Sequence, residues 1–175
     1  DNLPTNWVSN ALWAQAFRGI SAATQAIESI TANSEHLSPA KKDQFLGEAY
    51  FLRAFNYFFL TRQYGRMPII DHVLTYDEYY TPRASIEETW EFMVQDLKQA
   101  IELLPKKSEY QAADLGRATQ GAAYAMLGKV YIYQGKFQEA YEALKEVVNS
   151  GEYGLEPNYA DVFTLEHENG IESLF

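Results

Sequence analysis

The spacing of apolar residues along the chain predicts five helices joined by irregular segments. Small and apolar residues recur at three- and four-residue steps from about Trp7 to Thr31, which predicts a first helix. Ser38 and Pro39 begin the second, because serine caps a helix N-terminus and proline suits the first helical position. This helix extends to about Tyr64 and is apolar nearly all round over residues 45–60. We therefore expect it to be central and buried.

Later helices have clear start and stop signals. Ser85 and Glu88 fit a capping box, and Pro105 ends the helix that follows it. One apolar stripe runs through this third helix, at Trp90, Val94, Leu97, Ile101 and Leu104. The fourth helix is predicted from about Thr119 to Gln134 and the fifth from Phe137 to about Asn149. Trp13 and Trp90 lie on helical stripes and are predicted core residues.

Two segments lack helical periodicity. Residues 66–84 form a long connection, and loops of that length inside compact domains are often functional. The last five residues, 171–175, alternate in polarity and suggest a short β-strand. The chain starts at Asp1 without methionine and stops without a polar tail, so we interpret it as a fragment of a longer protein.

Composition narrows the possible functions. The 175 residues suit one domain, and 47% hydrophobic residues exclude wholesale disorder. A net charge of −10 argues against nucleic acid as a partner. Cysteine is absent, which removes thiolate metal sites and cysteine nucleophiles. His36, His72 and His167 show no metal-ligand spacing, so we predict no metal and no cofactor. Aromatic residues reach 15%, which favours helix packing or stacking on a sugar face.

The long connection contains candidate ligand-binding residues: Tyr76, Tyr79, Tyr80 and Arg83. A sugar site needs rings for the C–H faces of the sugar and polar groups for its hydroxyls. The alternative is that these tyrosines only attach the loop to the scaffold, and the sequence favours that alternative.

The last two predicted helices carry a repeat signature at about residues 119–150. Tyr124, Leu127, Gly128 and Tyr131 precede Ala140 with a spacing that resembles the tetratricopeptide (TPR) pattern. Gly128 allows the facing helix to come close, and Ala140 is its small counterpart. The predicted fold is therefore all-α, with stacked TPR-like helical hairpins.

Short motifs follow one another along the whole chain in a defined order. The motifs are Gly47–Ala54, Tyr57–Leu60, Tyr64–Pro68, Asp96–Pro105, Gly116–Ala123, Gly135–Ala140 and Ser150–Leu155. No single motif is specific, but their order and spacing resemble those of the SusD/RagB family. The resemblance marks seven residues as structural: Gly47, Arg53, Gly65, Pro68, Arg117, Gly128 and Ala140.

The resemblance implies a non-catalytic glycan-binding protein. Family members are surface lipoproteins of the bacterial outer membrane that pass oligosaccharides to a SusC-like TonB-dependent transporter. Residues 1–175 would then form one TPR-like SusD-type domain of a longer protein. Family glycan sites use Trp and Asn, so Trp7 and Asn10 are candidates by residue type, although a partly exposed tryptophan at a helix end is the simpler interpretation.

Other interpretations remain open at this point. Arg53, in an apolar helix, is expected to be a buried structural cation paired with an acidic residue rather than a ligand-binding group. A TPR-like scaffold that binds a partner peptide is the main alternative function. An all-helical glycoside hydrolase is a weaker one, since nothing in the sequence pairs carboxylates such as Asp114, Asp161 and Glu166.

Overall fold

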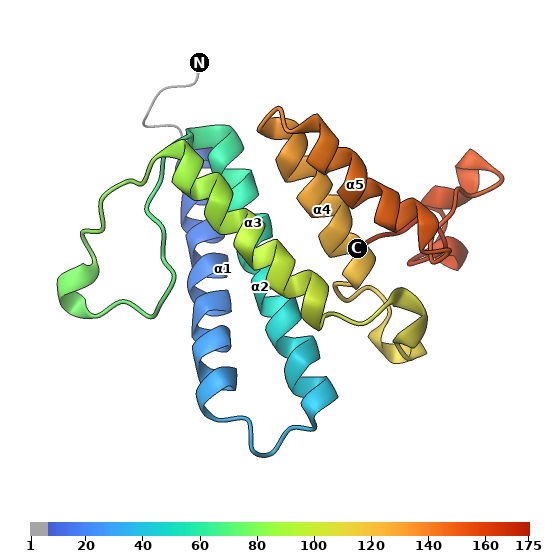
Figure 1. The fold of residues 1–175 in the computed structure, drawn as a ribbon, viewed down its shortest axis with the longest axis horizontal. Helices are drawn as coiled ribbons and strands as arrows, with labels where there is room; N and C mark the ends of the chain where they lie inside the picture. Colours follow the sequence, from blue (N-terminus) through green and yellow to red (C-terminus); the bar gives the residue numbers. More distant parts are fainter. Residues whose placement is uncertain (1–6) are drawn as a thin grey trace.

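The computed structural model describes residues 7–175, and all regular elements within that range are helices (Figure 1). The five α-helices in this range are α1 (Trp7–Ala32), α2 (Pro39–Tyr64), α3 (Ile86–Leu103), α4 (Gln120–Tyr133) and α5 (Phe137–Asn149). Short 3₁₀ turns lie in the connections, as η1 (Tyr76–Glu78), η2 (Lys107–Glu109), η3 (Ala112–Asp114), η4 (Tyr159–Phe163) and η5 (Leu165–His167). All five predicted α-helices are present, with boundaries within about two residues of those expected.

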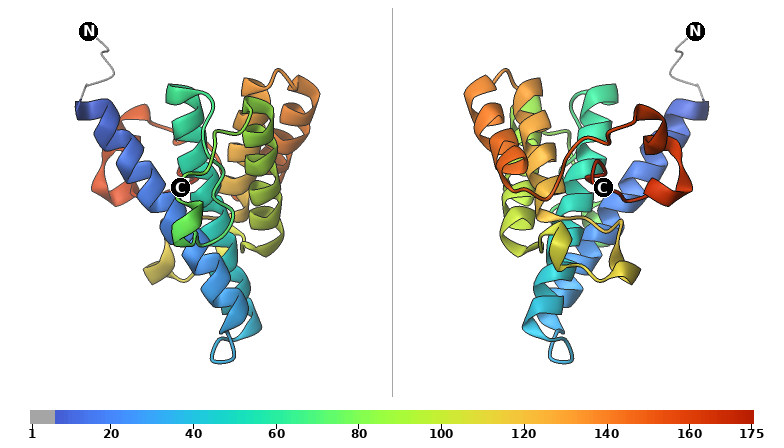
Figure 2. Two further views of the ribbon diagram at one scale, coloured as in Figure 1. Left: turned by 90° about the vertical axis from the view of Figure 1, so that its left-hand side faces the viewer. Right: turned by 90° about the vertical axis from the view of Figure 1, so that its right-hand side faces the viewer.

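Helices that follow one another in sequence also pack on one another in space. α1 contacts α2, α2 contacts α3, α3 contacts α4 and α4 contacts α5. Figure 2 shows α3, α4 and α5 on the side of α2 that faces away from α1. The all-helical, TPR-like arrangement predicted from the sequence is confirmed.

The helix ends follow from local chemistry. The Ser38 side chain accepts a hydrogen bond from the Lys41 amide at the start of α2. Gly65 ends that helix with φ of 71°, in the left-handed region that glycine adopts without strain. At the start of α3, Ser85 and Glu88 form the predicted capping box.

The core lies around α2, as expected from the apolar stretch at residues 45–60. Its inward residues Phe51, Tyr57 and Phe58 are at most 2% exposed. The prediction that α2 is buried nearly all round was too strong, because Leu52 and Phe59 are exposed on its outer face. Among the described residues, every fully buried side-chain nitrogen or oxygen has a hydrogen-bond partner.

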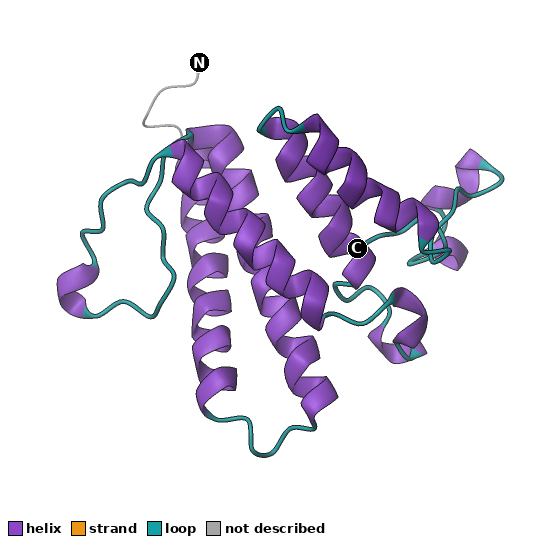
Figure 3. Cartoon of the chain, viewed as in Figure 1, coloured by secondary structure: helices purple, strands orange, loops and turns teal. Residues whose placement is uncertain are grey.

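The predicted C-terminal strand is wrong. Residues 171–175 form a turn and irregular backbone, and no part of the chain from residue 7 onward is a strand (Figure 3). The Gly154 amide donates one hydrogen bond of 3.1 Å to the Ile171 carbonyl, and one such bond does not make a ladder. Phe175 instead packs edge-on against Phe51, with ring centroids 4.9 Å apart.

Candidate functional site

The long connection between α2 and α3 lies beside α1 (Figure 1). Two hydrogen bonds join the backbone of this loop to side chains of α1. The Thr24 hydroxyl donates to the Ile70 carbonyl at 3.2 Å, and the Val73 amide donates to Glu28 Oε1 at 2.6 Å. The loop is therefore attached along one of its edges rather than projecting freely into solvent.

Tyr57 of α2 also holds the backbone of this loop through its hydroxyl. Its hydroxyl donates to the Pro68 carbonyl at 3.3 Å and accepts from the Ile70 amide at 2.7 Å. Burial raises the pKa of the Tyr57 phenol well above its ordinary value. The hydroxyl therefore stays protonated and can serve both bonds.

Arg53 joins three helices and the loop. Its Nε and Nη2 donate to the two carboxylate oxygens of Asp96 on α3, each at 2.8 Å. Its Nη1 donates to Thr24 Oγ1 at 3.2 Å and to the Asp71 carbonyl at 3.3 Å. The buried cation thus has an acidic partner and fixes the start of the loop against α1.

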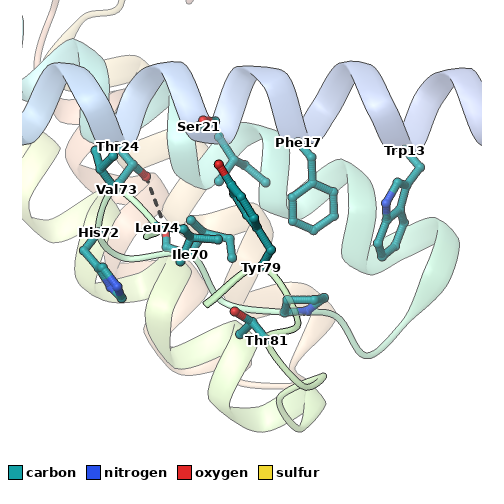
Figure 4. Close-up of a pocket in the computed structure, with 12 residues that line it drawn as sticks. Trp13, Phe17, Ser21, Thr24, Ile70, His72, Val73, Leu74, Tyr79 and Thr81 are labelled. Atoms are coloured by element: carbon teal, nitrogen blue, oxygen red, sulfur yellow. Dashed lines mark hydrogen bonds between the residues drawn. The ribbon is translucent and has the colours of Figure 1, made fainter. Parts of the chain in front are cut away.

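A cavity of about 450 Å³ lies between α1 and the loop. Figure 4 shows Trp13 and Phe17 projecting from α1 toward the segment that carries Tyr79 and Thr81. The volume is in the range of small-molecule sites, and the wall combines rings and aliphatic groups with a few polar ones. The lining residues are Trp13, Phe17, Ile20, Ser21, Thr24, Pro68, Ile70, His72, Val73, Leu74, Tyr79 and Thr81.

Of the loop residues predicted from the sequence, only Tyr79 lines this cavity. Tyr76 stacks edge-on against Tyr79, with ring centroids 5.9 Å apart, so these two rings form a pair. The Tyr80 side chain is 97% exposed and Arg83 is also exposed, and neither lines the cavity. The hypothesis that tyrosines merely attach the loop does not fit Tyr80, which is almost fully in solvent.

Trp7 and Asn10 lie in the first turn of α1 and are exposed, Trp7 by 78%. Asn10 is seven residues before Phe17 and therefore on the same side of α1, roughly 10 Å along its axis. Both residues are outside the cavity, and Asn10 lies on a continuation of the helix face that forms its wall.

Sequence reasoning missed the α1 side of the cavity. Trp13 was predicted to be core; it is partly buried, and it lines the cavity and contacts Tyr64 edge-on at 5.1 Å. Phe17, four residues later, was not singled out. The spacing of Trp13 and Phe17 on one helix face was visible, but nothing in the sequence showed that the loop lies opposite them. Trp90, also predicted to be core, is partly buried.

Charge at the edge of the loop is concentrated around His72. Its Nδ1 lies 2.7 Å from Asp71 Oδ1 and its Nε2 lies 3.0 Å from Glu78 Oε1. These two carboxylates raise the pKa of His72 above its ordinary value. Hydrogen bonds from the Thr75 amide and hydroxyl, and then from His72, lower the pKa of Glu78 to about 2. This cluster stabilises the η1 turn that carries the tyrosine pair.

Across residues 7–175, His and acidic side chains form no group of three that could hold a metal ion. None of the helices in that part of the chain is long and apolar enough to span a membrane.

The residues marked as structural lie at close contacts, caps and ion pairs. A Cβ at Gly128 would lie 2.6 Å from Leu144 Cγ, and Ala140 is buried in the same α4–α5 interface. A Cβ at Gly47 would lie 2.9 Å from Leu104 Cγ. Arg117 is paired with Glu48, Nε to Oε1 at 2.7 Å.

The stacked hairpins and the cavity beside the loop define an all-helical, TPR-like scaffold. A SusD-like family model, described as "Starch-binding associating with outer membrane", matches residues 3–132. The SusD-like protein P2 of Formosa agariphila is 31% identical over 176 residues, covering 97% of this chain and 34% of that protein. The chain therefore belongs to the SusD/RagB family, which is associated with the bacterial outer membrane.

Solved structures agree with this assignment. A SusD-like carbohydrate-binding protein from Bacteroides fragilis matches with a TM-score of 0.93 at 26% identity, covering 99% of this chain and 34% of that one. A laminarin-binding SusD-like protein matches with a TM-score of 0.83 at 29% identity, covering 90% of this chain and 35% of that one. The chain spans about a third of the length of these relatives.

Proposed function

We propose that this chain is the helical scaffold domain, residues 1–175, of a non-catalytic glycan-binding lipoprotein at the cell surface. It captures oligosaccharides and passes them to a SusC-like TonB-dependent transporter. The single observation that carries the proposal is the cavity between α1 and the loop, with Trp13, Phe17 and Tyr79 in its wall. Aromatic rings beside hydroxyl groups suit the alternating apolar faces and hydroxyls of a sugar ring.

The surroundings of the cavity support this proposal. Tyr76 and Tyr80 are exposed on the loop beside Tyr79, Asn10 continues the α1 side of the wall, and Trp7 is exposed in the same first turn of α1. A glycan longer than the cavity would meet these residues next, and Arg83 offers hydrogen-bond donors on the same loop. Related proteins that bind carbohydrate, including a laminarin-binding one, have the same helical arrangement.

Titration calorimetry of the chain against a panel of soluble polysaccharides tests the proposal, with reducing ends assayed in the same samples. We expect saturable binding without hydrolysis. Tyr79→Ala should weaken binding about fivefold, since one ring contact contributes about 1 kcal/mol. Tyr110→Phe, far along the chain from the cavity, serves as the control. Release of reducing ends would favour the glycoside hydrolase instead, and absence of binding to every glycan would contradict the proposal.

An exposed apolar face of α5 favours a protein partner as well. Phe137, Tyr141 and Val148 lie on one side of the helix by their spacing, and each is more than half exposed. In the proposed complex this face contacts a protein, and the same observation supports the TPR-like scaffold as the second candidate function. Co-purification with the transporter from outer membranes, with and without Phe137→Ser, separates the two. A scaffold for another protein would not retain the transporter.

A further inference from the structure

Among the described residues, the cavity wall contains no cation that is free of a carboxylate partner. Its twelve lining residues include no Asp, Glu, Lys or Arg. The titratable side chains among them are His72 and Tyr79. Besides the His72 ring and the indole N–H of Trp13, the polar side-chain groups in the wall are hydroxyls. Two of these already serve the fold, because Thr24 donates to the Ile70 carbonyl and Thr81 to the Glu78 carbonyl at 2.7 Å.

The cations near the cavity are already compensated or lie outside its wall. His72 is held between the carboxylates of Asp71 and Glu78. Arg53 is 4% exposed behind the wall and is engaged by both oxygens of Asp96. Arg83 is exposed on the loop, two residues beyond the lining residue Thr81, but does not line the cavity.

Three carboxylates contact residues of the cavity wall. Glu28 accepts a hydrogen bond from the amide of the lining residue Val73, and Asp71 and Glu78 contact the lining residue His72. The chain as a whole carries a net charge of −10. A carboxylate or sulfate ester on a ligand would lose its hydration in the cavity, meet no free cation among the described lining residues, and lie near the three carboxylates that contact them.

We propose that the cavity between α1 and the loop selects uncharged glycans and rejects those that carry uronate or sulfate groups. This inference rests on the proposed glycan-binding function and adds the substrate class of that site. Selection then depends on the lack of a free cation in the wall, since His72 is already paired, and not on a particular contact with a hydroxyl.

Matched ligands test the charge directly. Neutral β-glucan, α-glucan and mannan oligosaccharides are each titrated beside the same oligosaccharide oxidised to the carboxylate at C6. The change replaces one CH₂OH group by a carboxylate and preserves the linkage. We expect the neutral member of a bound pair to bind about tenfold tighter or more. Tyr79→Ala should weaken that binding, whereas Tyr159→Ala, at an exposed tyrosine of η4 outside the cavity, should not.

A variant with an added cation in the cavity wall is the second test of the charge selection. Val73 lines the cavity and is 47% exposed, so Val73→Lys adds a cation at the edge without a buried charge. This variant should bind the oxidised oligosaccharide more tightly than the wild type, while Val73→Met, which adds length without charge, should not.

The possible outcomes distinguish a failure of the charge selection from a failure of glycan binding itself. Equal affinity for the neutral and oxidised members overturns the charge selection and leaves glycan binding in place. Neutral binding that Tyr79→Ala does not weaken also overturns it, because the ligand then binds elsewhere on the chain. No binding of any oligosaccharide contradicts the proposed function itself, and the inference with it.

Discussion

Arg53 and Asp96 form two parallel hydrogen bonds of 2.8 Å in the centre of the helical stack, with both side chains about 5% exposed. The pair joins α2 to α3, and the remaining guanidinium nitrogen extends to Thr24 on α1 and to the backbone of the loop. Three helices and one cavity wall therefore depend on a single buried cation.

Asp96→Asn is expected to destabilise the chain by about 3–5 kcal/mol, because it leaves the Arg53 charge buried without its counter-ion. Urea unfolding followed by circular dichroism measures the loss. Lys41→Ala is the control, since Lys41 forms an exposed ion pair of 3.8 Å with Asp114 and such pairs contribute at most about 1 kcal/mol. Equal effects of the two substitutions would contradict the central role of the buried pair.

Tyr57→Phe preserves ring packing but removes the hydroxyl that holds Pro68 and Ile70. We expect a loss of about 1–3 kcal/mol in unfolding free energy, since the Ile70 amide loses its partner in a partly buried position. Faster hydrogen exchange at Ile70 measured by NMR should accompany it. Tyr76→Phe is the matched control, as the Tyr76 side chain is 83% exposed. Unchanged exchange at Ile70 would show that other contacts suffice to hold the loop.

The loop has a pH optimum set by His72 and Glu78. The pKa of His72 is raised, so its contribution is complete below its ordinary value of 6.5 and is lost as pH rises through the raised pKa. The pKa of Glu78 is lowered to about 2, so its contribution is complete above its ordinary 4.5 and is lost as pH falls toward 2. We therefore expect the η1 turn to be most stable between about pH 4.5 and 6.5.

NMR titration of His72 checks this prediction. Its pKa should fall in Asp71→Asn, because one of the two carboxylates that favour the protonated ring is lost. Asp77→Asn, an acid in the same turn, is the control. If both variants lowered the pKa of His72 equally, the cause would be general charge rather than the hydrogen bond.

Gly128→Leu tests the close contact between α4 and α5. A Cβ at this position would already lie 2.6 Å from Leu144 Cγ, so a larger side chain forces the hairpin apart. We expect a destabilisation of about 1–3 kcal/mol, read from thermal or urea unfolding. Ala14→Leu enlarges an exposed position of α1 and should have little effect. A stable Gly128→Leu variant would indicate that the hairpin can repack.

Helix positions and helix ends could be predicted from the sequence without knowledge of the fold. Ser38, Gly65 and the Ser85–Glu88 box predicted helix ends because capping involves residues within one turn of each other. The apolar periods predicted all five α-helices for a similar reason, since the residues that share a helix face are three or four positions apart. The prediction of a strand at residues 171–175 was wrong because a strand needs a partner strand, and residues 7–175 provide none.

The amino-acid sequence by itself determined the five α-helices, their caps, the small residues at α4–α5 and membership of the SusD/RagB family. It also indicated that Arg53 needs an acidic partner, since a buried charge cannot remain unpaired. Only the tertiary structure identified that partner as Asp96, 43 residues away. It also placed the loop against Trp13 and Phe17, because the cavity exists only where backbone from two distant segments meets.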